Sequence, residues 1–281
     1  MTLRTDTVLD NLVAGVKEDL ATDKGKRPLA EVRSQVADMP PTLSFATAIR
    51  RSSSGPDSDG GRIRVIAEVK RASPSQGTIA ESFDPPATAR RYEAGGASAV
   101  SVLTERREFR GSIDDLRFVR AAVGLPVLRK EFIFDPYQVF EARAAGADAI
   151  LLIAAILEEA VLEDLRCQAE ELGMEALVEV YAEEEVGRSL ASGARIIGVN
   201  NRDLKTFEVD TGQALRIHSI VLQDKPEDLI FVSESGIFGW KEVAPLVEAG
   251  VDAILVGESL MRADSPEALL NELRGISSEN S

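Results

Sequence analysis

One short pattern recurs along most of this chain and limits what it can fold into. In each copy a single glycine precedes a short apolar run, and the clearest copies are residues 96–100, 146–150, 173–177, 193–197 and 250–254. With the variant at residues 124–128 included, the copies follow one another at roughly 26 residues. Each copy is typical of a helix that ends at a left-handed glycine and is followed by a buried strand. The pattern therefore predicts helices and strands that alternate along the chain.

The apolar runs are continuous, which is typical of parallel strands that are covered on both faces. Eight strands are predicted, at residues 63–69, 99–103, 127–130, 149–153, 176–180, 196–199, 229–232 and 253–256. Eight strands fit a closed barrel better than an open doubly wound sheet, which usually has about five or six. The sequence also contains no GxGxxG and no GxxxxGK[ST] pattern. The predicted fold class is α/β, a (β/α)8 TIM barrel.

The segment before the first predicted strand has a different, helical pattern. Val8, Leu12, Val16 and Leu20 recur every four positions and predict one amphipathic helix. We expect Pro28 in the first turn of a second helix, Ser44 as the N-cap of a third, and a Ser/Gly-rich loop at 51–61. Two parts are therefore expected: a helical extension with this loop at 1–62 and a catalytic barrel at 63–276, followed by a fraying end at 277–281.

Charge and composition narrow the function classes. The chain has 32 basic and 47 acidic residues, a net charge of -15, which disfavours nucleic acid and anionic membranes as partners. Cys167 and His218 are the only residues of their types, so neither a disulfide within the chain nor a metal site rich in cysteine or histidine is expected. The longest apolar run, 149–157, is far shorter than the roughly 20 residues that span a bilayer. With no signal-peptide pattern, we expect a cytoplasmic protein.

Charged residues stand at the ends of several predicted strands, where the active site of such a barrel lies. Glu68 and Lys70 end the first strand and share one face because they are two residues apart. Lys130 ends the third strand and Glu179 the fifth. A single charge of this kind could be solvated at the rim, but a set of them is costly to bury unless cations and carboxylates pair. No serine, cysteine or histidine stands at a strand end together with a plausible base, so the pattern predicts acid–base chemistry by lysine and glutamate.

Two glycine-containing turns add a weaker signal. Ser235-Gly236 follows the seventh predicted strand and Gly257-Glu258 follows the eighth. Many barrels of this type bind phosphate at that position through backbone amides. Glycine turns after strands are common, and only their place in the strand order makes a phosphate site the favoured interpretation.

Eight stretches of the chain match one known family. They are residues 66–75, 101–105 with 109–112, 128–133, 135–138, 177–180, 198–204, 232–237 and 256–261. Together they resemble the indole-3-glycerol phosphate synthases of tryptophan biosynthesis, and they span the whole predicted barrel. The resemblance implies that 1-(2-carboxyphenylamino)-1-deoxyribulose 5-phosphate is converted to indole-3-glycerol phosphate with loss of carbon dioxide and water. It implies no cofactor and no metal.

The resemblance also implies roles for five catalytic residues. Lys130 would be the general acid for ring closure, and Glu179 the acid–base group for the loss of water. Lys70 would hold anionic groups of the substrate, and Glu68 would fix the lysine geometry. Asn200 would orient the intermediate.

Ten further residues are implied at the substrate. They are Ser73, Pro74, Phe109, Phe132, Arg202, Glu234, Ser235, Gly236, Gly257 and Glu258. The two phenylalanines would flank the aromatic ring, although core packing is nearly as good an explanation for either. The last four would bind phosphate through backbone amides. Glu258 departs from the family pattern, because its carboxylate would stand beside the phosphate and only its amide could bind it.

Two other functions remain open on the residues alone. A neighbouring phosphosugar isomerase would share the phosphate end but would use a Cys/Asp or Asp/Asp pair, and Cys167 is far from any predicted strand end. A noncatalytic phosphate-binding barrel would not need Lys130 and Glu179. The partner expected in every case is a small phosphorylated molecule, and contact with neighbouring enzymes of a pathway is left open. A substrate-covering role of 1–62 is also left open.

Overall fold

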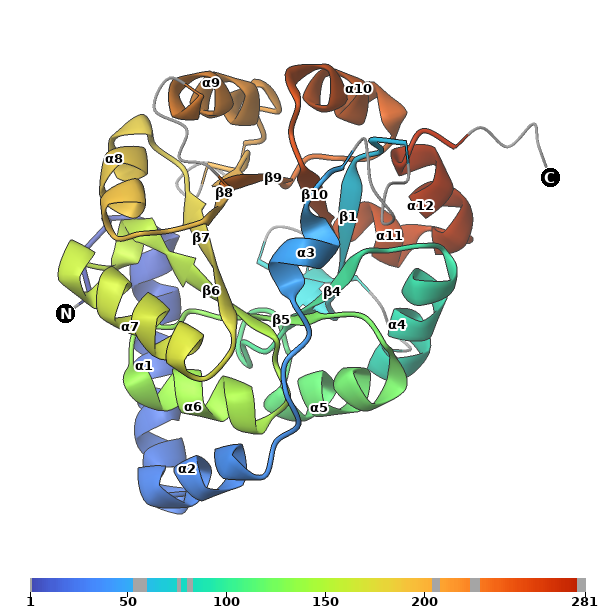
Figure 1. The fold of residues 1–281 in the computed structure, drawn as a ribbon. Coiled ribbons are helices and arrows are strands. Elements are labelled where there is room, and N and C mark those ends of the chain that lie inside the picture. The colour runs from blue at the N-terminus through green and yellow to red at the C-terminus, as the bar shows by residue number, and fades with distance from the viewer. Residues whose placement is uncertain are drawn as a thin grey trace.

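Eight parallel strands close into a barrel in the computed structural model, which describes residues 2–52, 60–74, 77–79, 83–203, 208–222 and 228–276. The barrel strands are β1 (Arg64–Val69), β4 (Ala99–Leu103), β5 (Val127–Lys130), β6 (Ala149–Ile153), β7 (Glu175–Val180), β8 (Ile196–Asn200), β9 (Ile230–Glu234) and β10 (Ala253–Val256). Each strand pairs with its neighbour in the chain, and β10 closes the barrel on β1 (Figure 1). The predicted (β/α)8 fold is confirmed, with every strand within two residues of its expected bounds.

An outer ring of helices surrounds the barrel (Figure 1). These helices are α4 (Pro85–Ala94), α5 (Ile113–Ala122), α6 (Pro136–Ala144), α7 (Glu159–Glu171), α8 (Glu183–Ala191), α9 (Gly212–Val221), α10 (Trp240–Ala249), α11 (Glu258–Arg262) and α12 (Pro266–Leu273). A single 3-10 turn, η1 (Ala154–Ile156), follows β6. The glycines of the five clearest repeats all have positive φ, between 80° and 92°. The repeated glycine is therefore the residue that lets each helix turn back into a strand.

The N-terminal segment forms three helices, α1 (Val8–Lys26), α2 (Leu29–Ala37) and α3 (Phe45–Ile49). Ser44 caps α3 as expected, because its side chain accepts a hydrogen bond from the Thr47 amide. Pro28 was expected one position further in: it is the N-cap of α2, and the helix begins at Leu29. In the predicted loop 51–61, residues 53–59 lie outside the described residues, as does the expected fraying end at 277–281.

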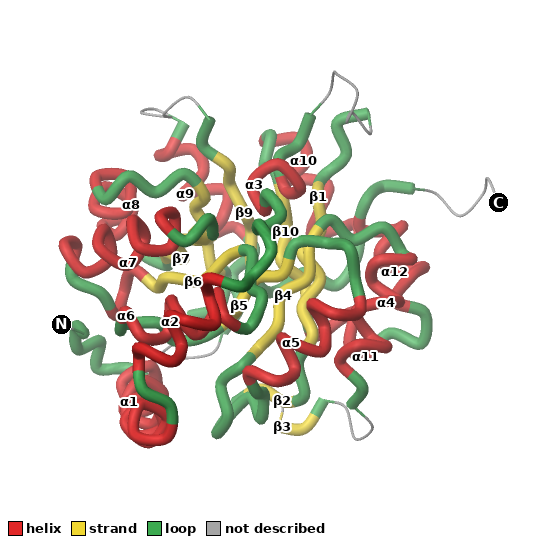
Figure 2. The backbone as a smooth tube through the Cα atoms, turned by 60° about the horizontal axis from the view of Figure 1, so that its bottom comes forward, coloured by secondary structure: helices red, strands yellow, loops and turns green. Residues whose placement is uncertain are grey.

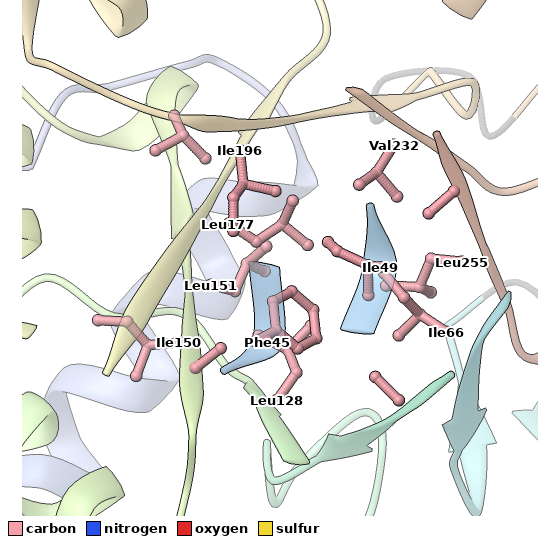
Figure 3. Packing of buried hydrophobic residues seen from close by; sticks show 14 of the residues in the cluster. Phe45, Ile49, Ile66, Leu128, Ile150, Leu151, Leu177, Ile196, Val232 and Leu255 are labelled. Atoms are coloured by element: carbon pink, nitrogen blue, oxygen red, sulfur yellow. The ribbon is translucent and has the colours of Figure 1, made fainter. Parts of the chain in front are cut away.

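Helix α3 closes the N-terminal end of the barrel. Phe45 and Ile49 are fully buried, and Figure 3 shows both among the inward-pointing side chains of the strands. The amide of Ala46 donates to the carboxylate of Glu175, the first residue of β7. Burial of two large apolar side chains contributes roughly 3–6 kcal/mol to stability.

Helix α1 and a small hairpin lie at the opposite end from α3 (Figure 2). The hairpin pairs β2 (Ala72–Ser73) with β3 (Gly77–Thr78) in antiparallel register, and neither strand was predicted. Within the described part of the chain, no helix is long and apolar enough to cross a membrane.

Candidate active site

All fifteen residues named from the sequence line one cavity at the C-terminal end of the barrel. Register explains why they meet. Residues paired across parallel strands point to the same side of the sheet, and the pairs include Leu103 with Lys130, Ile153 with Glu179, and Asn200 with Glu234. Because the side chains at these positions all point toward the barrel axis, the polar ones form a single buried layer above the apolar interior.

Lys130 is the centre of this layer. Its Nζ lies 3.5 Å from Glu179 Oε2 and 3.5 Å from Glu234 Oε2. Asn200 Nδ2 donates to Glu179 Oε1 over 3.3 Å, which fixes the orientation of that carboxylate. Burial works against the charged lysine, but Glu179, Glu234 and Glu68 outweigh it and raise the pKa of Lys130 above its ordinary value. The Lys130 side chain is therefore protonated at neutral pH and has a proton to donate.

A second ion pair stands beside Lys130. Lys70 Nζ lies 2.9 Å from Glu68 Oε1. Burial favours a protonated Glu68, but the charges of Lys70 and Lys130 are stronger together and lower the pKa of Glu68. Gly257 makes room for this pair, because a Cβ there would collide with Glu68 Oε1 and lie 2.9 Å from Lys70 Nζ. Gly257 therefore leaves space for the Glu68–Lys70 ion pair, in addition to its expected place in the phosphate-binding turn.

Glu234 is the least satisfied group in the layer. It is only 1% exposed, and among the described residues neither carboxylate oxygen has a hydrogen-bond partner. Burial raises the pKa of Glu234 to about 8 against the opposing charge of Lys130, and the carboxylates of Glu179 and Glu68 add to the rise. A Cβ at position 198 would collide with Glu234 Oε1, so Gly198 provides the space for this side chain. An unsatisfied buried acid of this kind is typical of a functional site.

The turn after β9 has an unusual backbone. Ser235 and Gly236 both have positive φ, 69° and 76°, and a non-glycine residue seldom adopts this conformation. Asn201, buried at the end of β8, holds the turn from below: its Nδ2 donates to Ser233 Oγ and to the Ser235 carbonyl, each over 3.1 Å. Asn201 was part of a strand-end motif in the sequence but was not among the expected site residues.

The carboxylate of Glu258, which is unexpected beside a phosphate, is paired with two arginines. Arg202 Nη2 lies 3.9 Å from one oxygen and Arg262 Nε lies 3.4 Å from the other. Gly257 is the N-cap of α11 and brings no side chain, so no side chain caps the start of this helix, and Gly257 and Glu258 both line the cavity. The acid therefore orders two arginines near the turn instead of repelling an anion.

Aromatic and apolar side chains form the other wall. The rings of Phe109 and Phe132 lie 6.4 Å apart between centroids and are tilted by 44°. Ser73 and Pro74 reach the cavity from β2 and the turn after it. Val8, Leu9 and Leu12 of α1 also line it, together with Phe238, which is 56% exposed. The periodicity of α1 showed its apolar stripe, but only tertiary structure shows that the stripe faces the cavity.

The single histidine and the single cysteine do not line this cavity. His218 packs in the core against Phe231, with ring centroids 4.7 Å apart. Cys167 is on α7 and is contacted by Arg166. Across the described residues no group of histidine, cysteine, aspartate and glutamate is arranged to hold a metal ion.

A closed parallel barrel with a buried lysine between two carboxylates, and glycine turns after its last strands, defines a (β/α)8-barrel enzyme of acid–base type. A family model described as indole-3-glycerol phosphate synthase matches residues 9–273. Proteins of that name from Leifsonia xyli and Mycolicibacterium vanbaalenii are 50% and 49% identical to this chain. The matches cover 96% and 95% of it and 98% and 93% of those proteins. The chain belongs to the indole-3-glycerol phosphate synthase family.

This membership confirms the activity expected from the motifs, that of a carbon–carbon lyase (carboxy-lyase) in tryptophan biosynthesis. A relative of the same name from Mycobacterium avium, 47% identical over 95% of this chain and 93% of its own length, agrees. The isomerase and the noncatalytic barrel are not supported. A solved structure, a thiamine phosphate pyrophosphorylase from Pyrococcus furiosus, shares the fold with a TM-score of 0.57. At 18% identity over 76% of this chain and 94% of that one, the likeness is of fold alone.

Proposed function

We propose that Lys130, Glu179 and Lys70 divide the chemistry of this carboxy-lyase among them, with Lys130 as the general acid of ring closure. The observation that carries the proposal is the position of Lys130, 3.5 Å from each of two buried carboxylates in the cavity where strand-end charges and aromatic rings meet. The substrate is 1-(2-carboxyphenylamino)-1-deoxyribulose 5-phosphate, and the products are indole-3-glycerol phosphate, carbon dioxide and water.

Ring closure needs a proton at the ketone oxygen. The aromatic carbon that carries the carboxylate attacks the ketone carbon, the carbonyl π bond breaks, and its oxygen takes a proton from the Lys130 ammonium. Loss of carbon dioxide then returns the electron pair of the broken carbon–carbon bond to the ring. A charged lysine aimed at the developing alkoxide lowers this barrier by electrostatic stabilisation and by proton transfer.

Loss of water needs an acid for the departing hydroxyl and a base for the proton that leaves the ring system. Glu179 fits this step because its carboxylate is ordered by Asn200 and lies within reach of the proton on Lys130. Glu234, whose pKa burial raises to about 8, is protonated at neutral pH and can donate a hydrogen bond to a hydroxyl of the intermediate. The two carboxyl groups thus have different proposed roles although they face the same lysine.

The remaining groups bind the two ends of the substrate. Lys70, held by Glu68, is the cation for the substrate carboxylate until it departs. Phe109 and Phe132 flank the aromatic ring. The amides of the turn at Ser235-Gly236 and of the start of α11 take the phosphate, supported by Arg202, which lies 3.9 Å from Glu258 at the start of α11.

The test is an assay of the purified chain with this substrate, compared with Lys130→Met and with Lys241→Met, an exposed lysine on α10. We expect the Lys130 variant to lose about 10²- to 10⁴-fold in kcat with an unchanged circular dichroism spectrum. The Lys241 variant should match the wild type. Activity of the Lys130 variant within about tenfold of the wild type would refute the assignment.

We also propose that residues 1–62 and the barrel at 63–276 act as one catalytic unit, because α1 lines the cavity and α3 fills the opposite end. A cytoplasmic location is proposed from the single cysteine and the small phosphorylated substrate. Contact with neighbouring enzymes of the pathway is an open part of this proposal. Co-purification from cells with and without cross-linking tests it.

A further inference from the structure

The loop between β4 and α5 is organised around one buried carboxylate. Glu105 is 1% exposed. Its Oε1 accepts the amide of Arg107 over 2.9 Å, and its Oε2 accepts the amides of Glu108 and Phe109 over 2.8 and 2.9 Å. The Gly111 amide donates to the Glu105 carbonyl over 2.8 Å and closes the loop. A single side chain therefore sets the path of residues 105–111, which we call the clamp loop.

The outer side of the clamp loop grips α1. Arg107 Nε and Nη2 donate to the two carboxylate oxygens of Asp19 over 3.1 and 2.7 Å, and its Nη1 donates to Glu18 over 2.9 Å. Arg106 makes the same two-pronged contact with Asp23, over 3.1 and 2.6 Å. Two-pronged arginine–carboxylate pairs fix orientation as well as distance.

Glycines on both partners allow this close approach. A Cβ on Gly15 of α1 would lie 2.9 Å from Arg107 Cδ, so the arginine crosses the helix where there is no side chain. A Cβ on Gly111 would collide with the Leu103 carbonyl, so the loop returns tightly against β4. The clamp loop has little freedom to move without moving α1.

The inner side of the same loop faces the cavity. Phe109, whose amide is held by Glu105, lines the cavity beside Phe132. Arg110, at φ 54°, donates from Nη1 to Thr78 Oγ1 of the β3 strand over 3.0 Å. Seven consecutive residues thus join α1, the β2–β3 hairpin and one aromatic wall of the cavity.

We propose that Glu105 and Arg107 are positioning residues for the substrate ring, acting through the clamp loop on Phe109 and on the apolar face of α1. The inference rests on the proposed function, since Phe109 is taken to contact the aromatic ring. Neither residue lines the cavity with its own carboxylate or guanidinium, and Lys130 is untouched by either. The clamp loop therefore acts on binding of the substrate, and the chemical step is left to the strand-borne charges.

The first test separates KM from kcat. In Glu105→Gln one acceptor oxygen and the charge are lost while the size is kept, and we expect KM to rise about tenfold with kcat within about threefold of the wild type. Arg107→Met loses exposed ion pairs, so a rise of about two- to fivefold is expected. Glu108→Ala, an exposed side chain in the same loop, is the matched control and should change neither constant. Equal losses in kcat with an unchanged KM would overturn the proposal.

The second test is a double-mutant cycle that remains informative if the Glu105 variant folds poorly. Arg107→Met and Phe109→Leu are measured singly and together. If the clamp loop transmits position, the double variant loses clearly less kcat/KM than the product of the two single losses. Losses that simply multiply would overturn the proposal, since Arg107 would then act independently of the ring wall. Failure of the proposed function is separate, because it appears as a wild type without activity on the substrate.

Discussion

The two ends of the barrel are equally buried and chemically opposite. At the N-terminal end, the side chains of Phe45 and Ile49 of α3 pack among apolar strand residues. At the C-terminal end, Glu68, Glu179 and Glu234 are at most 4% exposed and face two lysines. Burial at the first end stabilises the fold, whereas burial at the second opposes it unless every charge is paired. The N-terminal end therefore stabilises the barrel, whereas the C-terminal end lowers its stability in order to hold the charges of the active site.

Helices of the same N-terminal segment cover both ends, in different ways. Helix α3 inserts large side chains into the interior and fills it (Figure 3). Helix α1 lies across the opposite end and contributes only its Val8, Leu9 and Leu12 edge, so a cavity remains beneath it. The contrast predicts that substitutions at the α3 end change stability, and that substitutions at the α1 end change activity.

The largest expected effect is that of Glu179→Gln at the charged end. The amide keeps the shape and can still accept from Asn200, but it has no proton to transfer, so loss of water should slow by about 10²- to 10⁴-fold. Single-turnover product analysis should show a decarboxylated intermediate that accumulates. The finding of unreacted substrate alone would move Glu179 to an earlier step.

At the apolar end, Phe45→Ala should lower the free energy of unfolding by about 3–5 kcal/mol, because a fully buried ring leaves a cavity behind. Its kcat, measured well below the unfolding transition, should stay within about twofold of the wild type. Denaturant titration gives the first quantity, and Leu43→Ala, at a position 41% exposed, is the control. A strong loss of kcat in a folded Phe45 variant would break the division between the ends.

Sequence patterns predicted the strands and the strand-borne site because both depend on local periodicity. A buried strand must be apolar throughout, so Glu179 within an apolar run is conspicuous, and one register rule brings it to Lys130. The positions of Val8 on α1 and of Asn201 under the Ser235 turn depend on contacts between segments far apart in the chain. Neither residue belongs to a periodic pattern that distinguishes it from ordinary core packing. Their places in the site therefore could not be predicted from the sequence.

Gly236→Asp tests whether the phosphate of the substrate binds at the turn after β9, at the charged end of the barrel. We expect about tenfold weaker substrate binding, because the carboxylate repels an anion and the new Cβ would collide with Val209. Gly250→Asp is the matched control: Gly250 also has a positive φ, 85° against 76° for Gly236, but no neighbour within 4 Å of a Cβ. Inorganic phosphate should compete with substrate in the wild type and the control, and much less in the Gly236 variant. Equal affinity for a product analogue in all three proteins would place the phosphate elsewhere.

The smallest effect concerns the cost of the buried acid at the charged end. Glu234 has a pKa raised to about 8 in the folded chain and an ordinary value near 4.3 when unfolded. Between these values the folded chain holds a proton that the unfolded chain has released, so stability falls as pH rises through this window.

Glu234→Gln removes this dependence, and the variant should therefore gain stability relative to the wild type between pH 5 and pH 8. We expect a gain of about 1 kcal/mol, less than an isolated group would give, because the charge of Lys130 beside Glu234 opposes the rise in its pKa. Denaturant titrations at the two pH values measure it, with the exposed Glu108→Gln as the control. A stability difference between variant and wild type that stays constant with pH would mean that Glu234 is ionised throughout. Glu234 would then have no proton with which to donate a hydrogen bond to the intermediate, and its proposed part in the loss of water would be lost.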